Sequence, residues 1–121
     1  MDAPANRGAS PSDVRTVRML ASECRMCFET AKYGPTRMRT FIEEGKRHVL
    51  LLRAVLDALP DRSARARLCR ARAWDAWLAS LCAGNQRKVW HHRVAFTNDA
   101  IRALGEVERH ARAWEGKLWS E

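Results

Sequence analysis

The segment 36–59 (TRMRTFIEEGKRHVLLLRAVLDAL) constrains the fold of this chain more than any other. Its apolar residues recur in alternating steps of four and three, which places them on one face of an α-helix. That face consists of Met38, Ile42, Gly45, Val49, Leu52, Leu56 and Leu59, and Phe41, His48 and Val55 widen it. A helix of this length spans roughly 36 Å at about 1.5 Å per residue. Other helices must cover a face that is apolar along its whole length.

Three further segments show helical spacing, and short turns separate them. The expected helices are 13–33, 36–59, 61–83 and 86–115. Gly34-Pro35, Pro60 and Gly84-Asn85 mark the turns, because proline and glycine interrupt helices. Helices joined by turns of two or three residues must reverse direction at each turn. The sequence therefore predicts an all-α protein, a single up-down-up-down four-helix bundle with a flexible N-terminal tail.

Capping residues predict the ends of the first helix. Ser12 is a good N-cap, and Asp13 would lie in the first turn against the positive end of the helix dipole. Gly34 is placed for a left-handed turn at the C-terminal end. The chain is therefore divided into a polar N-terminal tail, 1–12, expected to be disordered in the isolated protein, and a helical bundle domain, 13–121.

Further features predict local structure later in the chain. Asp61 or Ser63 is expected to cap the third helix. Residues 97–99 (TND) resemble a helix start, but the apolar spacing passes through them unbroken, so one long fourth helix is predicted. The segment 116–121 begins with glycine and is expected to leave that helix. Gly45 costs about 1 kcal/mol relative to alanine inside a helix and therefore predicts a close helix crossing.

Length and charge narrow the class of protein. The chain has 121 residues, which corresponds to one domain, and a net charge of +8. Its 22 basic residues include four Lys and therefore 18 Arg. The arginine content reflects a GC-rich genome, a polyanionic partner or both. A polyanionic partner would favour arginine because guanidinium binds phosphate through two parallel hydrogen bonds. No apolar run approaches the roughly 20 residues of a membrane span, and 1–12 lacks the apolar core of a secretory signal. We therefore expect an intracellular protein, cytoplasmic, mitochondrial or viral.

The four cysteines are expected to be reduced and to pack as small apolar side chains. Cys24 and Cys27 form a CxxC pair, but they lie well inside the first helix. A redox cysteine needs a helix N-terminus, where the dipole lowers the thiol pKa. Cys69 and Cys82 are about 20 Å apart along one helix, so they cannot bind one metal ion.

Glutamate–histidine pairs occur in two helices, Glu44 with His48 and Glu106 with His110. Both glutamates fall about 100° or more from the centres of the apolar faces and point to solvent, and His48 is expected at the border of the core. The chain shows no set of nucleophile, base and acid and no glycine-rich phosphate loop. We therefore expect no metal, no cofactor and no enzymatic activity.

Two groups of basic residues are candidates for polyanion binding. In an up-down bundle the first and third turns lie at the same end, here called the basic end. Its cations are Lys32, Arg37, Arg39, Arg87, Lys88 and Arg93, and Tyr33, His91 and His92 lie among them. The second group, at the opposite end, consists of Arg62, Arg65 and Arg72. Such residues bind the phosphates of RNA or DNA without reading sequence, and a solvated basic surface is the alternative interpretation.

The third helix carries most of the candidate partner interface. Its second half is apolar on one side through Trp74, Trp77, Leu78, Leu81 and Cys82. Arg67 and Arg70 continue that side into the first half, which a four-helix bundle cannot easily bury. Tryptophan and arginine are enriched in interface hot spots. The predicted contacts are Trp74, Trp77, Arg67, Arg70 and Trp119.

We therefore favour a non-catalytic helical subunit of a larger assembly that contacts other protein subunits through these surfaces. The alternative is a small basic protein that recognises the phosphate backbone of a nucleic acid without sequence specificity.

Overall fold

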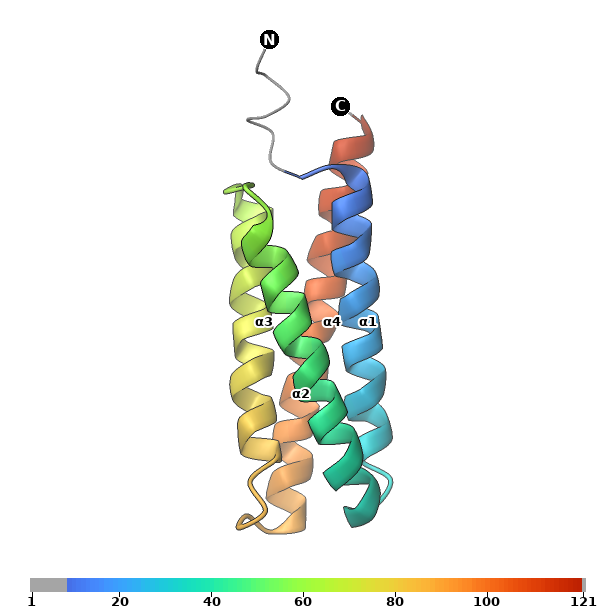
Figure 1. The fold of residues 1–121 in the computed structure, drawn as a ribbon, viewed down its shortest axis with the longest axis vertical. Helices are drawn as coiled ribbons and strands as arrows, with labels where there is room; N and C mark the ends of the chain where they lie inside the picture. The colour runs from blue at the N-terminus through green and yellow to red at the C-terminus, as the bar shows by residue number, and fades with distance from the viewer. Residues whose placement is uncertain (1–8, 121) are drawn as a thin grey trace.

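The structure is a computed structural model that describes residues 9–120. Four helices are present, α1 (Pro11–Ala31), α2 (Pro35–Ala58), α3 (Ala64–Ala83) and α4 (Trp90–Ser120), and residues 9–120 contain no strand. Successive helices run in opposite directions, and each one packs against two others in the order α1, α2, α3, α4 around the bundle (Figure 1). The predicted all-α four-helix bundle is confirmed.

The N-terminal part of the predicted tail, residues 1–8, lies outside the described residues. No helix within the described range is both long enough and apolar enough to cross a membrane.

The first helix begins earlier than predicted, because Ser10 rather than Ser12 is its N-cap. The Ser10 hydroxyl accepts a hydrogen bond from the Asp13 amide at 3.2 Å, and the Asp13 carboxylate accepts one from the Ser10 amide at 3.1 Å. Pro11 occupies the first helical position, where its fixed φ fits the helix and its missing N–H is not needed. The prediction of Ser12 as the cap was wrong because it did not use this proline.

The first turn differs in detail from the prediction, whereas at the second turn one of the two predicted caps, Ser63, is confirmed. Gly34 has φ 157° and ψ 163°, an extended conformation with positive φ, and it precedes α2 instead of closing α1 in a left-handed turn. Lys32 caps α1 in the right-handed region. At the second turn Ser63 caps α3 by accepting from the Ala66 amide at 3.3 Å, and Asp61 accepts from the Ser63 amide at 2.7 Å.

The fourth helix begins at Trp90, later than predicted, and passes through 97–99 without a break. Thr97 is buried, and its hydroxyl donates to the Arg93 carbonyl at 2.8 Å, so this side chain bonds within the helix instead of capping a new one. The helix also continues beyond the predicted end, through Gly116 to Ser120. The reason is that Glu115 is buried against α1, which holds this part of α4 in place.

The apolar face of α2 forms the centre of the core, as predicted. Its buried residues are Met38, Ile42, Gly45, Val49, Leu52 and Leu56. A Cβ atom at Gly45 would lie 2.6–2.9 Å from three ring carbons of Phe28, which is itself fully buried. The close approach predicted at Gly45 is present, and the neighbour is an aromatic ring of α1.

Helix α3 faces the core with small side chains. Its buried residues are Ala66, Cys69, Ala73, Ala76, Ser80 and Ala83. The larger apolar side chains found in the sequence lie beside this face, so Trp77 is half-buried and Trp74 is exposed. Small core residues allow α3 to approach its neighbours closely. The large apolar side chains of this helix consequently lie on its flanks.

Candidate interaction surfaces

The edge between α2 and α3 exposes large apolar side chains from both helices. We call this the α2/α3 surface, and it consists of Leu50, Arg53, Trp74, Trp77, Leu78 and Leu81. Leu50, Trp74, Leu78 and Leu81 are each between 42% and 47% exposed. Scattered exposed apolar residues are normal on a soluble protein, whereas adjacent ones mark a candidate interaction site.

A contact between Arg53 and Trp74 shows that these side chains form one surface. The guanidinium carbon of Arg53 lies 4.3 Å from the centroid of the Trp74 ring, which joins α2 to α3 by a cation–π interaction. Leu50 lies one turn before Arg53, and Leu78 lies one turn after Trp74. Because the two helices are antiparallel, Leu50 and Leu78 lie on the same side of this contact.

The two arginines predicted as partner contacts are placed differently. Arg67 is exposed on the same flank of α3 as Trp74, as helical spacing requires. Arg70 is half-buried and donates to the carbonyl oxygens of Leu56 at 2.9 and 3.1 Å and of Leu59 at 2.8 Å. Arg70 therefore satisfies the free carbonyls at the C-terminal end of α2, and its guanidinium is already engaged within the fold.

The predicted contact Trp119 is 66% exposed and lies in the last turn of α4, which does not contribute to the α2/α3 surface. Trp114, one of the five tryptophans, is buried instead. Its indole N–H donates to the Asp61 carboxylate at 3.1 Å, so the turn between α2 and α3 is bonded to α4.

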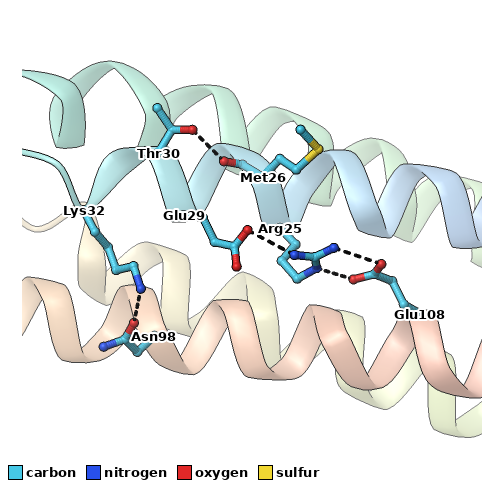
Figure 2. Close-up of polar contacts among 7 residues, drawn as sticks. All are labelled: Arg25, Met26, Glu29, Thr30, Lys32, Asn98 and Glu108. Carbon is cyan, nitrogen blue, oxygen red and sulfur yellow. Dashed lines mark hydrogen bonds and ion pairs between the residues drawn. The ribbon is translucent and has the colours of Figure 1, made fainter.

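An ion pair links α1 to α4 along the edge between them. Figure 2 shows Arg25 of α1 placed between Glu29 of its own helix and Glu108 of α4, with two hydrogen bonds to Glu108. The hydrogen bond with Glu108 raises the pKa of Arg25. Further along, Lys32 donates to the Asn98 side chain at 3.0 Å (Figure 2).

A second ionic cluster joins the start of α1 to the end of α4. The Arg15 and Arg18 guanidinium groups donate to the two oxygens of Glu115 at 3.0 and 3.1 Å. Burial alone would raise the pKa of Glu115, but the hydrogen bonds from both arginines outweigh it and lower this pKa below 4.5. A hollow of about 250 Å³ lies nearby on the α1/α4 edge, lined by charged residues, Met19 and Ser22.

The basic end is present as predicted, because the α1–α2 and α3–α4 turns lie at the same end of the bundle (Figure 1). Arg37 lies 6.0 Å from the Tyr33 ring centroid, and Lys88 lies 5.4 Å from that of Phe96. Within residues 9–120, none of the six predicted cations forms an ion pair with a carboxylate.

Two of these cations are nevertheless engaged within the fold. The Arg93 guanidinium donates to the Ala83 carbonyl at 2.8 Å and so satisfies a free carbonyl at the C-terminal end of α3. Lys32 is bonded to Asn98, as described above. Arg37, Arg39 and Arg87 are exposed, and Lys88 is half-buried. Arg39 also lines a shallow hollow of about 240 Å³.

The three arginines predicted at the opposite end each contact another residue of the fold. Arg62 donates to the Leu59 carbonyl at 3.2 Å, and Arg72 pairs with Asp75 at 3.0 Å. Arg65 lies 3.3 Å from the His110 ring nitrogen on the α4 side of α3. Burial, with Arg109 and Arg65 next in effect, lowers the pKa of His110. Each of these side chains therefore already has a contact within the fold.

The cysteines and histidines differ in burial and in their contacts. Cys24 and Cys69 are buried, and burial raises the pKa of both thiols, that of Cys69 to about 11. Cys27 and Cys82 are only half-buried, so the predicted packing applies fully to two of the four. The His48 ring nitrogen lies 2.8 Å from the Glu44 carbonyl. Over 9–120, no three His, Cys, Asp or Glu side chains are placed to hold a metal ion.

Comparison of the chain with protein families, with curated protein sequences and with solved structures finds no significant match.

Proposed function

We propose that this protein is a non-catalytic helical subunit of a larger assembly and that it contacts a protein partner through the α2/α3 surface. One observation carries the proposal: α3 fills the core with alanine, serine and cysteine while Trp74, Leu78 and Leu81 remain exposed beside it. Burial of a large apolar side chain contributes about 1.5–3 kcal/mol. The exposed side chains therefore supply free energy for association that folding of the single chain leaves unused.

The chemistry of the surface also suits a protein partner. The Arg53 guanidinium lies over the Trp74 ring, and this contact favours one orientation of the indole and reduces the side-chain freedom lost on binding. Tryptophan and arginine are the residues that most often dominate binding energy at protein interfaces.

The test compares two double variants of the tagged protein recovered from its own cells. Leu78→Ser/Leu81→Ser should release the chain from its assembly and leave it at the mass of a monomer in native mass measurements. Met19→Ser/Met26→Ser is the matched control, because both methionines are exposed on α1, away from the surface. It should retain the assembly. Wild-type protein that is monomeric in the cell, or a surface variant that stays assembled, would contradict the proposal.

A second function, binding of phosphate backbones at the basic end, is supported by one observation. Arg37, Arg39 and Arg87 are exposed, and no carboxylate of the described chain pairs with them. Binding to mixed-sequence duplex DNA should weaken with salt at a log–log slope of roughly −0.9 per phosphate contacted. Arg37→Ala/Arg87→Ala should reduce this slope by about two units and leave the melting temperature unchanged. Unaltered binding by this variant would show that the basic end is a solvated surface and does not bind the DNA.

A further inference from the structure

We infer that the segment bound at the α2/α3 surface is an amphipathic helix whose apolar stripe is flanked by acidic residues. This inference rests on the proposed function and specifies its partner. Three properties of the surface carry it: the spacing of its apolar side chains, its extent, and the charge of its rim.

The spacing suits a helix lying along the edge. Trp74, Leu78 and Leu81 follow one another at steps of four and three residues, so they form a ridge roughly 10 Å long on one flank of α3. Leu50 and Arg53 form the opposing side on α2, antiparallel to it. Helices bind such paired ridges with anchors spaced at i, i+3 or i+4, and i+7.

The extent of the surface also favours a single helix. A few partly exposed apolar side chains present on the order of a few hundred Å². A standard interface buries roughly 800 Å² on each partner. The apolar part of this surface is therefore too small for a stable apolar interface between two globular domains. A helix that covers it must also contact its charged rim.

The rim next to the apolar ridge is basic. Arg53 lies over Trp74. Arg67 is exposed on the same flank of α3, about two helical turns before Trp74. Neither forms an ion pair with a carboxylate within 9–120. The exposed carboxylates of this side of α2 are Glu43, which already pairs with Lys46 at 3.3 Å, and Asp57, whose single negative charge is outnumbered by the two arginines. Acidic residues beside the stripe of the incoming helix would complement Arg53 and Arg67.

The same charges disfavour a second copy of the chain as the occupant. Two copies pairing through this surface would bring the unpaired arginines of both into one interface, and each chain carries a net charge of +8. Like charges facing one another across an interface weaken association. A partner of opposite charge is therefore the better occupant.

The inference is tested with two labelled peptides and the full chain, by fluorescence anisotropy. Both peptides are amphipathic helices with the same leucine stripe, and they differ only in carrying Glu or Lys at the flanking positions. The Glu-flanked peptide should bind at least about tenfold more tightly at low salt, and its advantage should shrink as salt screens the charges. The variant Arg53→Glu/Arg67→Glu should reverse the preference.

Two further variants separate specific from general binding. Leu78→Ser/Leu81→Ser should weaken both peptides by at least about tenfold, and Met19→Ser/Met26→Ser should bind both as the wild type does. Equal binding of the two peptides, tighter binding of the Lys-flanked peptide, or no binding of either would overturn the inference. A homodimer that Leu78→Ser/Leu81→Ser separates would assign the surface to a second copy and overturn it too.

These outcomes are distinguishable from failure of the proposed function. If the serine variant leaves its cellular assembly but neither peptide binds the wild type, the surface is an interface and the acidic helix is rejected. If the serine variant stays in its assembly, the surface is not the interface, and both proposals fail.

Discussion

The α1/α4 edge and the α2/α3 edge belong to one bundle but differ in their side chains. The first carries ion pairs between helices, and the second carries exposed apolar side chains. Along α1/α4, Arg25 pairs with Glu108, and Arg15 and Arg18 pair with Glu115. Each carboxylate is satisfied by a partner within the chain. Along α2/α3, Arg53 contacts Trp74 through a cation–π interaction, and the neighbouring leucines are exposed to solvent.

This difference indicates which edge is complete in the single chain. Half-buried ion pairs between helices fix how two helices lie against each other, because each charge needs its particular partner. The exposed leucines of the α2/α3 surface carry no charge and therefore fix no such pairing. The α1/α4 edge thus serves the fold, whereas the α2/α3 edge is available for association.

The largest expected effect on stability comes from a change in the core that lies between the two edges. Leu52→Ala should lower the free energy of unfolding by about 2–5 kcal/mol, because Leu52 is fully buried and its removal leaves a cavity. Urea denaturation measures this value. A loss below about 0.5 kcal/mol, the range of ordinary surface changes, would show that this face is not the core.

The second prediction compares two sides of α2. Gly45→Ala should destabilise the protein by about 1–3 kcal/mol, because the added methyl group would force the buried Phe28 ring to move. Leu50→Ala, on the exposed side, should change stability by less than about 0.5 kcal/mol. Both values come from urea denaturation. Restoration of stability by Phe28→Leu in the Gly45→Ala background would identify the ring as the cause, whereas a stabilising Gly45→Ala would contradict the close approach.

The third prediction tests the ionic edge through pH. Since the pKa of Glu115 is lowered in the folded state from 4.5, its contribution to stability is present above about pH 4.5 and is lost as the pH falls through the folded value. Glu115→Gln should cost about 1 kcal/mol at neutral pH and flatten the decline of the melting temperature below pH 4.5. An unchanged acid profile for this variant would show that Glu115 does not couple folding to pH.

The smallest expected effect belongs to the α2/α3 surface. Leu78→Ser/Leu81→Ser should change the free energy of unfolding of the monomer by less than about 0.5 kcal/mol per residue, since both side chains are exposed. Its acid profile should match that of the wild type. A large loss of stability would mean that this edge also serves the fold, and the contrast between the two edges would disappear.

The architecture followed from local signals in the sequence. The apolar spacing of 36–59 predicted its buried face residue by residue, and Gly34-Pro35 and Pro60 predicted the reversals of direction. Helix ends were less accurate because competing caps stand close together. Ser10 and Ser12 are both good caps, and Pro11 between them decides in favour of Ser10.

Contacts between distant residues could not be predicted in this way. Arg25 and Glu108 are 83 residues apart, and no local pattern connects them. The role of Arg70 was also missed, because its partners are backbone carbonyls, which leave no trace in residue identity. In α3, an apolar side of large residues was visible, but the true core face consists of four alanines with Cys69 and Ser80, which periodicity of large apolar residues cannot detect.

The bonds of Trp114 and Glu115 have a consequence for biosynthesis. Trp114 donates a hydrogen bond to Asp61 in the turn between α2 and α3, and Glu115 pairs with Arg15 and Arg18 near the start of α1. During translation, α1, α2 and α3 are therefore complete before either bond can form. The final arrangement of the earlier helices must wait until this part of α4 has left the ribosome, so folding of the bundle is completed after most of its chain has been made.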